Sequence, residues 1–213
     1  MLYSPSMVLA KVAGIKTVTR RLVKNTMGVC DELKEIAPYL RVGYCEHNEE
    51  MGSRICPKWK PGDLIYGKEP FTISYSFTGK GWADVIGFYH ADKSMFSASL
   101  SEHEADKFRK WKKNHFGKSS LFMFKSLARI WDEIVSVRVE RLQDITEDDC
   151  LREGIGNAIG GCYFNYGGIR PMPTARESYR TLWDSLNAER APWSSNPCVW
   201  RIETKPCNPE CAS

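Results

Sequence analysis

The sequence has no long apolar run, and this absence limits where we expect the protein to reside. Nowhere in its 213 residues do about 18 apolar residues follow one another, so no transmembrane helix is predicted. The segment Met1–Ala10 also lacks the charged start and long apolar stretch of a secretory signal. We therefore expect a cytoplasmic protein that does not bind a membrane.

Paired cysteine motifs are missing as well. None of the eight cysteines forms a CxxC pair, the tight spacing of strong zinc signatures. Cys45, His47 and Cys56, with Cys30 nearby, are a candidate zinc set, but their irregular spacing argues against it. We expect no metal and no other cofactor. In a cytoplasmic chain of this length, cysteines are expected to be thiols rather than a disulfide framework.

The chain has neither a strong net charge nor an internal repeat. Its formal charge is +4, with 42% hydrophobic and 26% charged residues, which is the composition of an ordinary folded protein. That balance allows an anionic ligand without requiring one. Expected strands and helices alternate without a regular βαβ rhythm, which favours an α+β fold with a mainly antiparallel sheet.

Capping and turn signals divide the chain into expected elements. Four helices are expected: three begin after the N-cap residues Ser4, Ser101 and Thr146, and the fourth is an amphipathic helix from Thr174 to Ala188. Strands are expected near residues 17–23, 64–66, 84–90, 135–142 and 197–204. We interpret 1–205 as a single domain, with insertions at about 25–57 and 93–120, and 206–213 as a flexible tail.

The segment from Gly14 to Arg21 concentrates groups that can carry chemistry. Lys16 and Arg21 can hold a phosphate or a base edge, and a threonine such as Thr19 can act as a nucleophile beside a basic amine. Residues three apart in one strand point to opposite faces, so Lys16 must precede the strand to reach Thr19. The alternative interpretation is a solvated basic loop.

Two carboxylates complete the set of candidates. Glu153 is expected at the C-terminus of a helix, where the helix dipole disfavours a negative charge, so it needs a cation nearby. Glu69 follows an apolar strand and precedes Pro70, so it can line a pocket or lie at its rim. Either glutamate can equally be an exposed surface residue.

These motifs resemble the ASCH domains of the PUA-like superfamily. Gly14, Lys16, Thr19 and Arg21 match the GxKxxTxR signature, and further similar segments follow in order at 61–63, 137–146, 153–155, 182–187 and 196–200. The full pattern is similar to the larger ASCH proteins of phages and prophages. The resemblance implies a small, mainly antiparallel PUA-like β-barrel with flanking helices and two insertions.

The resemblance also implies a function. A small member of the family is an amidohydrolase of N4-acetylcytidine, and its catalytic residues correspond to Lys16, Thr19 and Glu153. We therefore expect an amidohydrolase acting on an N4-acylated cytosine nucleoside or a related modified base. Further contacts to this substrate are expected from Arg21 and Arg129 (sugar or phosphate), Tyr66 and Phe71 (stacking) and Glu69 (second carboxylate).

Two alternatives remain open. The chain can be a non-catalytic reader of RNA or of a modified nucleotide, which its arginines favour. It can also be a phage accessory protein whose insertions bind a host protein. Nothing in the sequence identifies such a partner.

Overall fold

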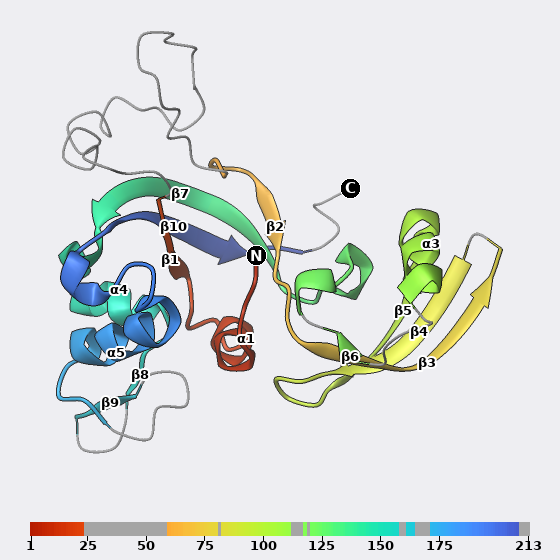
Figure 1. Ribbon diagram of the computed structural model, residues 1–213, viewed down its shortest axis with the longest axis horizontal. Coiled ribbons are helices and arrows are strands. Elements are labelled where there is room, and N and C mark those ends of the chain that lie inside the picture. Colours follow the sequence, from red (N-terminus) through yellow and green to blue (C-terminus); the bar gives the residue numbers. More distant parts are fainter. Residues whose placement is uncertain are drawn as a thin grey trace, which may run out of the picture. The chain divides into compact units, whose positions relative to one another are not determined.

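The computed structural model describes residues 1–23, 59–80, 82–111, 117–118, 120–157, 161–164 and 171–208. They form a mixed α+β fold with mostly antiparallel strands, a few helices and one sheet curled into a half-barrel (Figure 1). The expected insertion at 25–57, with the candidate zinc residues Cys30, Cys45, His47 and Cys56, lies outside the described residues.

The chain divides into two compact units, each built from separate segments. The first unit comprises Met1–Ala13, Ile65–Asp132 and Cys207–Ser213, and the second comprises Gly14–Leu64 and Glu133–Pro206. The expectation of a single domain over 1–205 stays a prediction.

The second unit is organised around the curled sheet, whose strand order is β1-β10-β7-β2. Its strands are β1 (Val18–Leu22), β2 (Leu64–Tyr66), β7 (Trp131–Arg141) and β10 (Cys198–Pro206), and the ends of β2 and β7 continue into the first unit. β1 and β10 are antiparallel, with Arg20 opposite Arg201. Its other elements are η3 (Leu142–Asp144), α4 (Glu147–Arg152), β8 (Gly156–Asn157), β9 (Tyr163–Phe164), α5 (Ala175–Asn187) and η4 (Trp193–Ser195).

The core of the second unit lies between the helices α4 and α5 and one face of the sheet. Ten buried residues form it: Leu142, Ile145, Cys150, Ile155, Ala175, Tyr179, Leu182, Trp183, Trp193 and Val199. Thr146 caps α4 and Thr174 caps α5, each by accepting a backbone N–H three residues on. The start of both helices is therefore fixed by the local sequence.

The first unit contains a second sheet, with the strand order β5-β4-β3-β6. Its elements are α1 (Pro5–Val12), β3 (Phe71–Gly79), β4 (Trp82–Tyr89), β5 (Met95–Leu100), α3 (Glu102–Trp111), β6 (Gly117–Lys118), η1 (Ser120–Phe122) and η2 (Lys125–Leu127). All the pairings in this sheet are antiparallel. Helix α3 packs on one face, where Ala105 and Phe108 join a core with Phe71, Ile73 and Val85.

Most expected elements are confirmed, and five strands were missed. The expected helices match α1, α3, α4 and α5, and Ser101 and Glu104 form the predicted reciprocal cap of α3. Strands β3, β5, β6, β8 and β9 were not predicted, and the segment expected as an insertion at 93–120 supplies β5, α3 and β6. Within the described ranges, no helix has the length and apolar character needed to cross a membrane.

Candidate functional site

Lys16 lies in the short connection between α1 and β1, as the sequence predicted, and its side chain is buried. Gly14 adopts a left-handed conformation with φ of 73° just before it, and β1 begins only at Val18. The Lys16 Nζ donates to the backbone carbonyls of Val18 and Glu153, both at 2.9 Å, and to the Glu153 carboxylate at 2.5 Å. These three acceptors match the three N–H groups of an ammonium ion.

Glu153 ends α4 and has the nearby cations that its position requires. Besides Lys16, it is contacted by Arg20, whose Nη1 lies 3.3 Å from Oε1. The Tyr179 hydroxyl donates to the same oxygen at 3.4 Å. Glu153 and Lys16 are only 3% and 2% exposed. The expectation that a carboxylate here is balanced by a cation is therefore confirmed.

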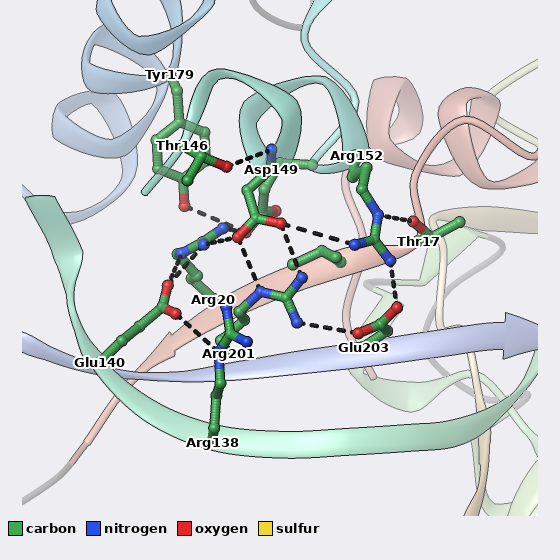
Figure 2. A network of polar contacts seen from close by, with 12 residues as sticks. Thr17, Arg20, Arg138, Glu140, Thr146, Asp149, Arg152, Tyr179, Arg201 and Glu203 are labelled. Carbon is green, nitrogen blue, oxygen red and sulfur yellow. Dashed lines mark hydrogen bonds and ion pairs between the residues drawn. The ribbon is translucent and has the colours of Figure 1, made fainter. Parts of the chain in front are cut away.

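A larger network of ion pairs surrounds this pair, with Asp149 at its centre (Figure 2). The carboxylate of Asp149 points from α4 toward the sheet and accepts from Arg20 of β1 at 2.6 Å. It also accepts two hydrogen bonds from Arg201 of β10, both at 2.8 Å. One carboxylate on a helix thus holds two arginines on neighbouring strands.

The charged side chains at the edges of the network also have partners of opposite charge. Arg20 also donates to Glu140 of β7 at 2.7 Å. Arg152 donates to the Glu203 carboxylate, and its Nε donates to the Thr17 hydroxyl at 3.2 Å. The described network therefore contains equal numbers of buried or half-buried basic and acidic groups: Lys16, Arg20, Arg152, Arg201, Glu140, Asp149, Glu153 and Glu203.

Burial and neighbouring charges shift the pKa values of several groups in the network. The hydrogen bonds from Arg201, with those from Arg20, hold the pKa of Asp149 well below its usual range despite burial. Burial opposes the charge of Arg20, but Glu153 and Glu140 outweigh it and raise the pKa of the guanidinium. Burial and then the charge of Glu153 raise the pKa of Tyr179 well above its ordinary value, so this hydroxyl keeps its proton at neutral pH.

Thr19 lies in β1, as predicted, but on the face away from this network. Successive strand residues point to opposite faces, and Arg20 points to Asp149, so Thr19 and Arg21 point the other way. Thr19 is opposite the fully buried Ile202 of β10. Among the described residues, no hydrogen bond joins its hydroxyl to Lys16 or Glu153. The structure thus brings two of the three expected catalytic residues together.

The other expected substrate-binding residues lie in the first unit, where Arg129 and Glu69 contact each other. Arg129 makes a two-pronged ion pair with the fully buried Glu69, at 2.8 and 2.9 Å, and its guanidinium lies 4.1 Å from the centre of the Tyr89 ring. Phe71 is fully buried in the core, and Tyr66 packs against Trp131 with 5.7 Å between ring centres.

Sequence reasoning missed Arg20, Asp149 and Arg201 as members of this cluster. One signal was available: Arg20 and Arg201 both occupy the middle of a predicted strand, where a charged residue needs a partner if its face is covered. The alternation of residues along a strand does not show which face of the sheet the helices cover.

The cysteines depart in part from the expectation of free thiols. Cys150, Cys162 and Cys207 are thiols, but Cys198 is disulfide-bonded. Burial raises the pKa of the Cys150 thiol to about 12, so it stays protonated and unreactive at neutral pH.

The part of the chain that the structure describes contains no group of three His, Cys, Asp or Glu side chains arranged to hold a metal ion.

Comparisons of the chain with protein-family models, with curated proteins and with solved structures found no match.

Proposed function

We propose that the chain is an ASCH-type protein with a PUA-like barrel, and that it removes the acyl group from an N4-acylated cytosine nucleoside or a related modified base. The supporting observation is the buried pair of Lys16 and Glu153. These residues are 137 positions apart, yet their side chains meet at 2.5 Å. Lys16 is the lysine of the GxKxxTxR signature, and Glu153 is the first residue of the similar segment at 153–155.

The pair is suited to moving protons during amide hydrolysis. Glu153 can accept a proton from the attacking group, and the Lys16 ammonium can donate one to the departing amine of the base. Water supplies the oxygen of the released carboxylic acid, and the C–N bond of the amide breaks. Because a carboxylate this close stabilises the ammonium form, we assign Lys16 the role of acid rather than base.

The position of Thr19 does not fit the role of nucleophile. The resemblance gives this role to Thr19, but its side chain points away from Lys16 and Glu153. We therefore propose that water attacks the acyl carbon directly. The variant Thr19→Val tests this assignment: substantial cytidine release supports water, and loss of release in a folded variant supports Thr19.

The proposal is tested by incubating the purified chain with N4-acetylcytidine and measuring cytidine by chromatography. We expect Lys16→Met and Glu153→Gln each to lower the rate by about a hundredfold or more, the usual range for loss of general acid–base catalysis. If the unaltered chain releases no cytidine, or if Lys16→Met releases it equally fast, the proposal is wrong.

Lys11→Met is the matched control for these variants. Lys11 is also buried and forms an ion pair with Asp132 at 2.8 Å, but both residues belong to the first unit. Its loss leaves a buried carboxylate just as Lys16→Met does, at a similar cost of about 3–5 kcal/mol. A variant that keeps turnover in spite of this cost separates catalysis from stability.

A non-catalytic reader of modified nucleotides is the second candidate. It is favoured by the direction of Thr19, because recognition of a base needs no nucleophile beside Lys16. In this case N4-acetylcytidine binds without being consumed. Isothermal calorimetry on the unaltered chain distinguishes the two: heat of binding without product supports the reader.

A further inference from the structure

The sheet of the first unit has one covered face and one open face. Inward residues of β3, β4 and β5 alternate with outward ones, and the inward ones share a core with residues of α3. The outward residues of β4 include Trp82, Ile86 and Phe88, and Met95 of β5 pairs with Phe88. Two residues that lie directly opposite each other on neighbouring strands have their side chains on the same face. These residues therefore form a continuous surface.

A β-bulge places two further aromatic rings on the open face. The register of β3 against β4 shifts between Ile73 and Tyr75, so Ser74 is the extra residue. Without it, strict alternation would put Phe71, Ile73, Tyr75 and Phe77 all on the covered face. With it, Tyr75 lies opposite Ile86 and points outward. Bulges commonly redirect side chains in this way.

These rings remain largely exposed, which is unusual for side chains of this size. Tyr75 is 68% exposed, Phe77 60% and Trp82 48%. The Trp82 indole lies against the backbone of Gly79, where a Cβ atom would collide with it. We call Tyr75, Phe77, Trp82 and the half-buried Phe88 the ring platform. Contiguous exposed aromatic surface of this kind marks a binding site rather than a random surface.

Basic and neutral polar groups accompany the platform. Lys80 lies in the turn between β3 and β4, next to Trp82, and the Lys93 ammonium lies 5.9 Å from the centre of the Phe88 ring at the other end. The His90 ring stacks on Phe88 at 5.7 Å. Asp84, the carboxylate that pairs with Phe77, already accepts a hydrogen bond from Ser99 at 2.7 Å.

We propose that the ring platform binds single-stranded nucleic acid, with bases stacked on the rings and phosphates near Lys80 and Lys93. Flat aromatic rings on a sheet can each take a base, and a cation at both ends complements a phosphate backbone. An apolar protein partner would leave these cations and the interleaved serines without a counterpart. The inference rests on the proposed function for its ligand class, since a modified base can be carried in a strand.

The test is fluorescence anisotropy with a labelled 12-nucleotide single-stranded RNA, the same sequence as DNA, and duplex RNA. The altered protein is Tyr75→Ser/Phe77→Ser, and the matched control is Leu121→Ser/Phe122→Ser. The control removes two apolar side chains of similar exposure (56% and 49%) from η1 of the same unit. We expect the platform variant to bind about tenfold more weakly or worse, and the control to bind like the unaltered chain.

Salt dependence and binding specificity sharpen the result. Two lysines contacting phosphates predict a slope of about −1.4 for log K against log salt concentration. The proposal would be overturned if the control variant weakened binding equally, or if duplex RNA bound more tightly than single-stranded RNA. A much steeper slope, or no binding at all, would also overturn it. So would a dimer of the unaltered chain that the platform variant abolishes, because the face would then bind a second copy.

The outcome is separable from that of the proposed function. The platform variant should hydrolyse free N4-acetylcytidine at the unaltered rate, because its changes lie in the other unit from Lys16 and Glu153. Loss of turnover in Lys16→Met with RNA binding intact supports both proposals. RNA binding by a chain that never releases cytidine supports the ring platform alone.

Discussion

Asp149 is the residue on which the buried network depends. It is the shared acceptor of Arg20 and Arg201, which are 0% and 4% exposed at their side chains. Taking a buried charge away from its partners costs more than the pair itself contributes, because the remaining charges stay desolvated.

We expect Asp149→Asn to lower the free energy of unfolding by about 3–5 kcal/mol, since two buried guanidinium groups each lose one of their counter-charges. Chemical denaturation measures this. The control is Asp106→Asn, which removes an exposed ion pair with Arg109 and should cost about 1 kcal/mol or less. Similar losses in both variants would contradict a dominant role for the buried network.

The stability lost in Asp149→Asn should depend on pH. The pKa of Asp149 is lowered in the folded state, so its contribution to stability is fully present above the ordinary pKa of about 3.9 and is lost as the pH falls below it. The stability difference between the unaltered chain and Asp149→Asn should therefore shrink below about pH 4. A difference that is constant from pH 7 to pH 2 would argue against the assignment.

How much the sequence could predict differs from residue to residue. The need of Glu153 for a cation followed from its position at a helix end, and Lys16 followed from the motif. Arg20 could not be placed, because a strand pattern gives two faces without saying which one a helix covers. The motif drew attention to Arg21, yet the neighbouring Arg20 contacts the network.

At the scale of elements, local signals were reliable and strand pairing was not. Ser4, Ser101 and Thr146 were all predicted as caps, because a cap depends on a few adjacent residues. Strand β3 was missed because the bulge at Ser74 breaks the period-two alternation that identifies a strand. Its existence depends on pairing with β4 rather than on its own pattern.

The connection between α1 and β1 contains one backbone position, Gly14, where we expect a side chain to lower stability. Gly14 has a φ of 73°, which other residues rarely adopt, and an added Cβ would meet no atom within 4 Å. Gly14→Ala should thus cost about 1–2 kcal/mol from backbone strain alone. Gly156→Ala is the control, since its surroundings are equally open and its φ is not positive. Thermal unfolding that ranks the two variants equally would refute this account.

At the scale of the whole molecule, the two units have separate hydrophobic cores. Val85 is fully buried in the core of the first unit and Val199 in that of the second. Neither core includes residues of the other. We therefore expect each unit to open with its own free energy.

Hydrogen exchange followed by mass spectrometry tests this expectation. Val85→Ala should cost about 2 kcal/mol and speed exchange in β3, β4 and β5, and Val199→Ala should do the same in β1 and β10. Each variant serves as the control for the other. If both variants speed exchange evenly throughout the chain, the units unfold as one.

The pairing of β1 with β10 has a consequence for synthesis of the chain. The hydrogen bond between Thr204 and Thr17 spans 187 positions. At about 5–20 residues per second, a ribosome needs roughly 10–40 s to cover that interval. Over nearly all of this interval Arg20 is already made but Arg201 is not, so β1, which directly follows the Lys16 connection, has to wait for its partner strand β10. Nascent chains that stall before Cys198 should therefore lack the Lys16–Glu153 pair.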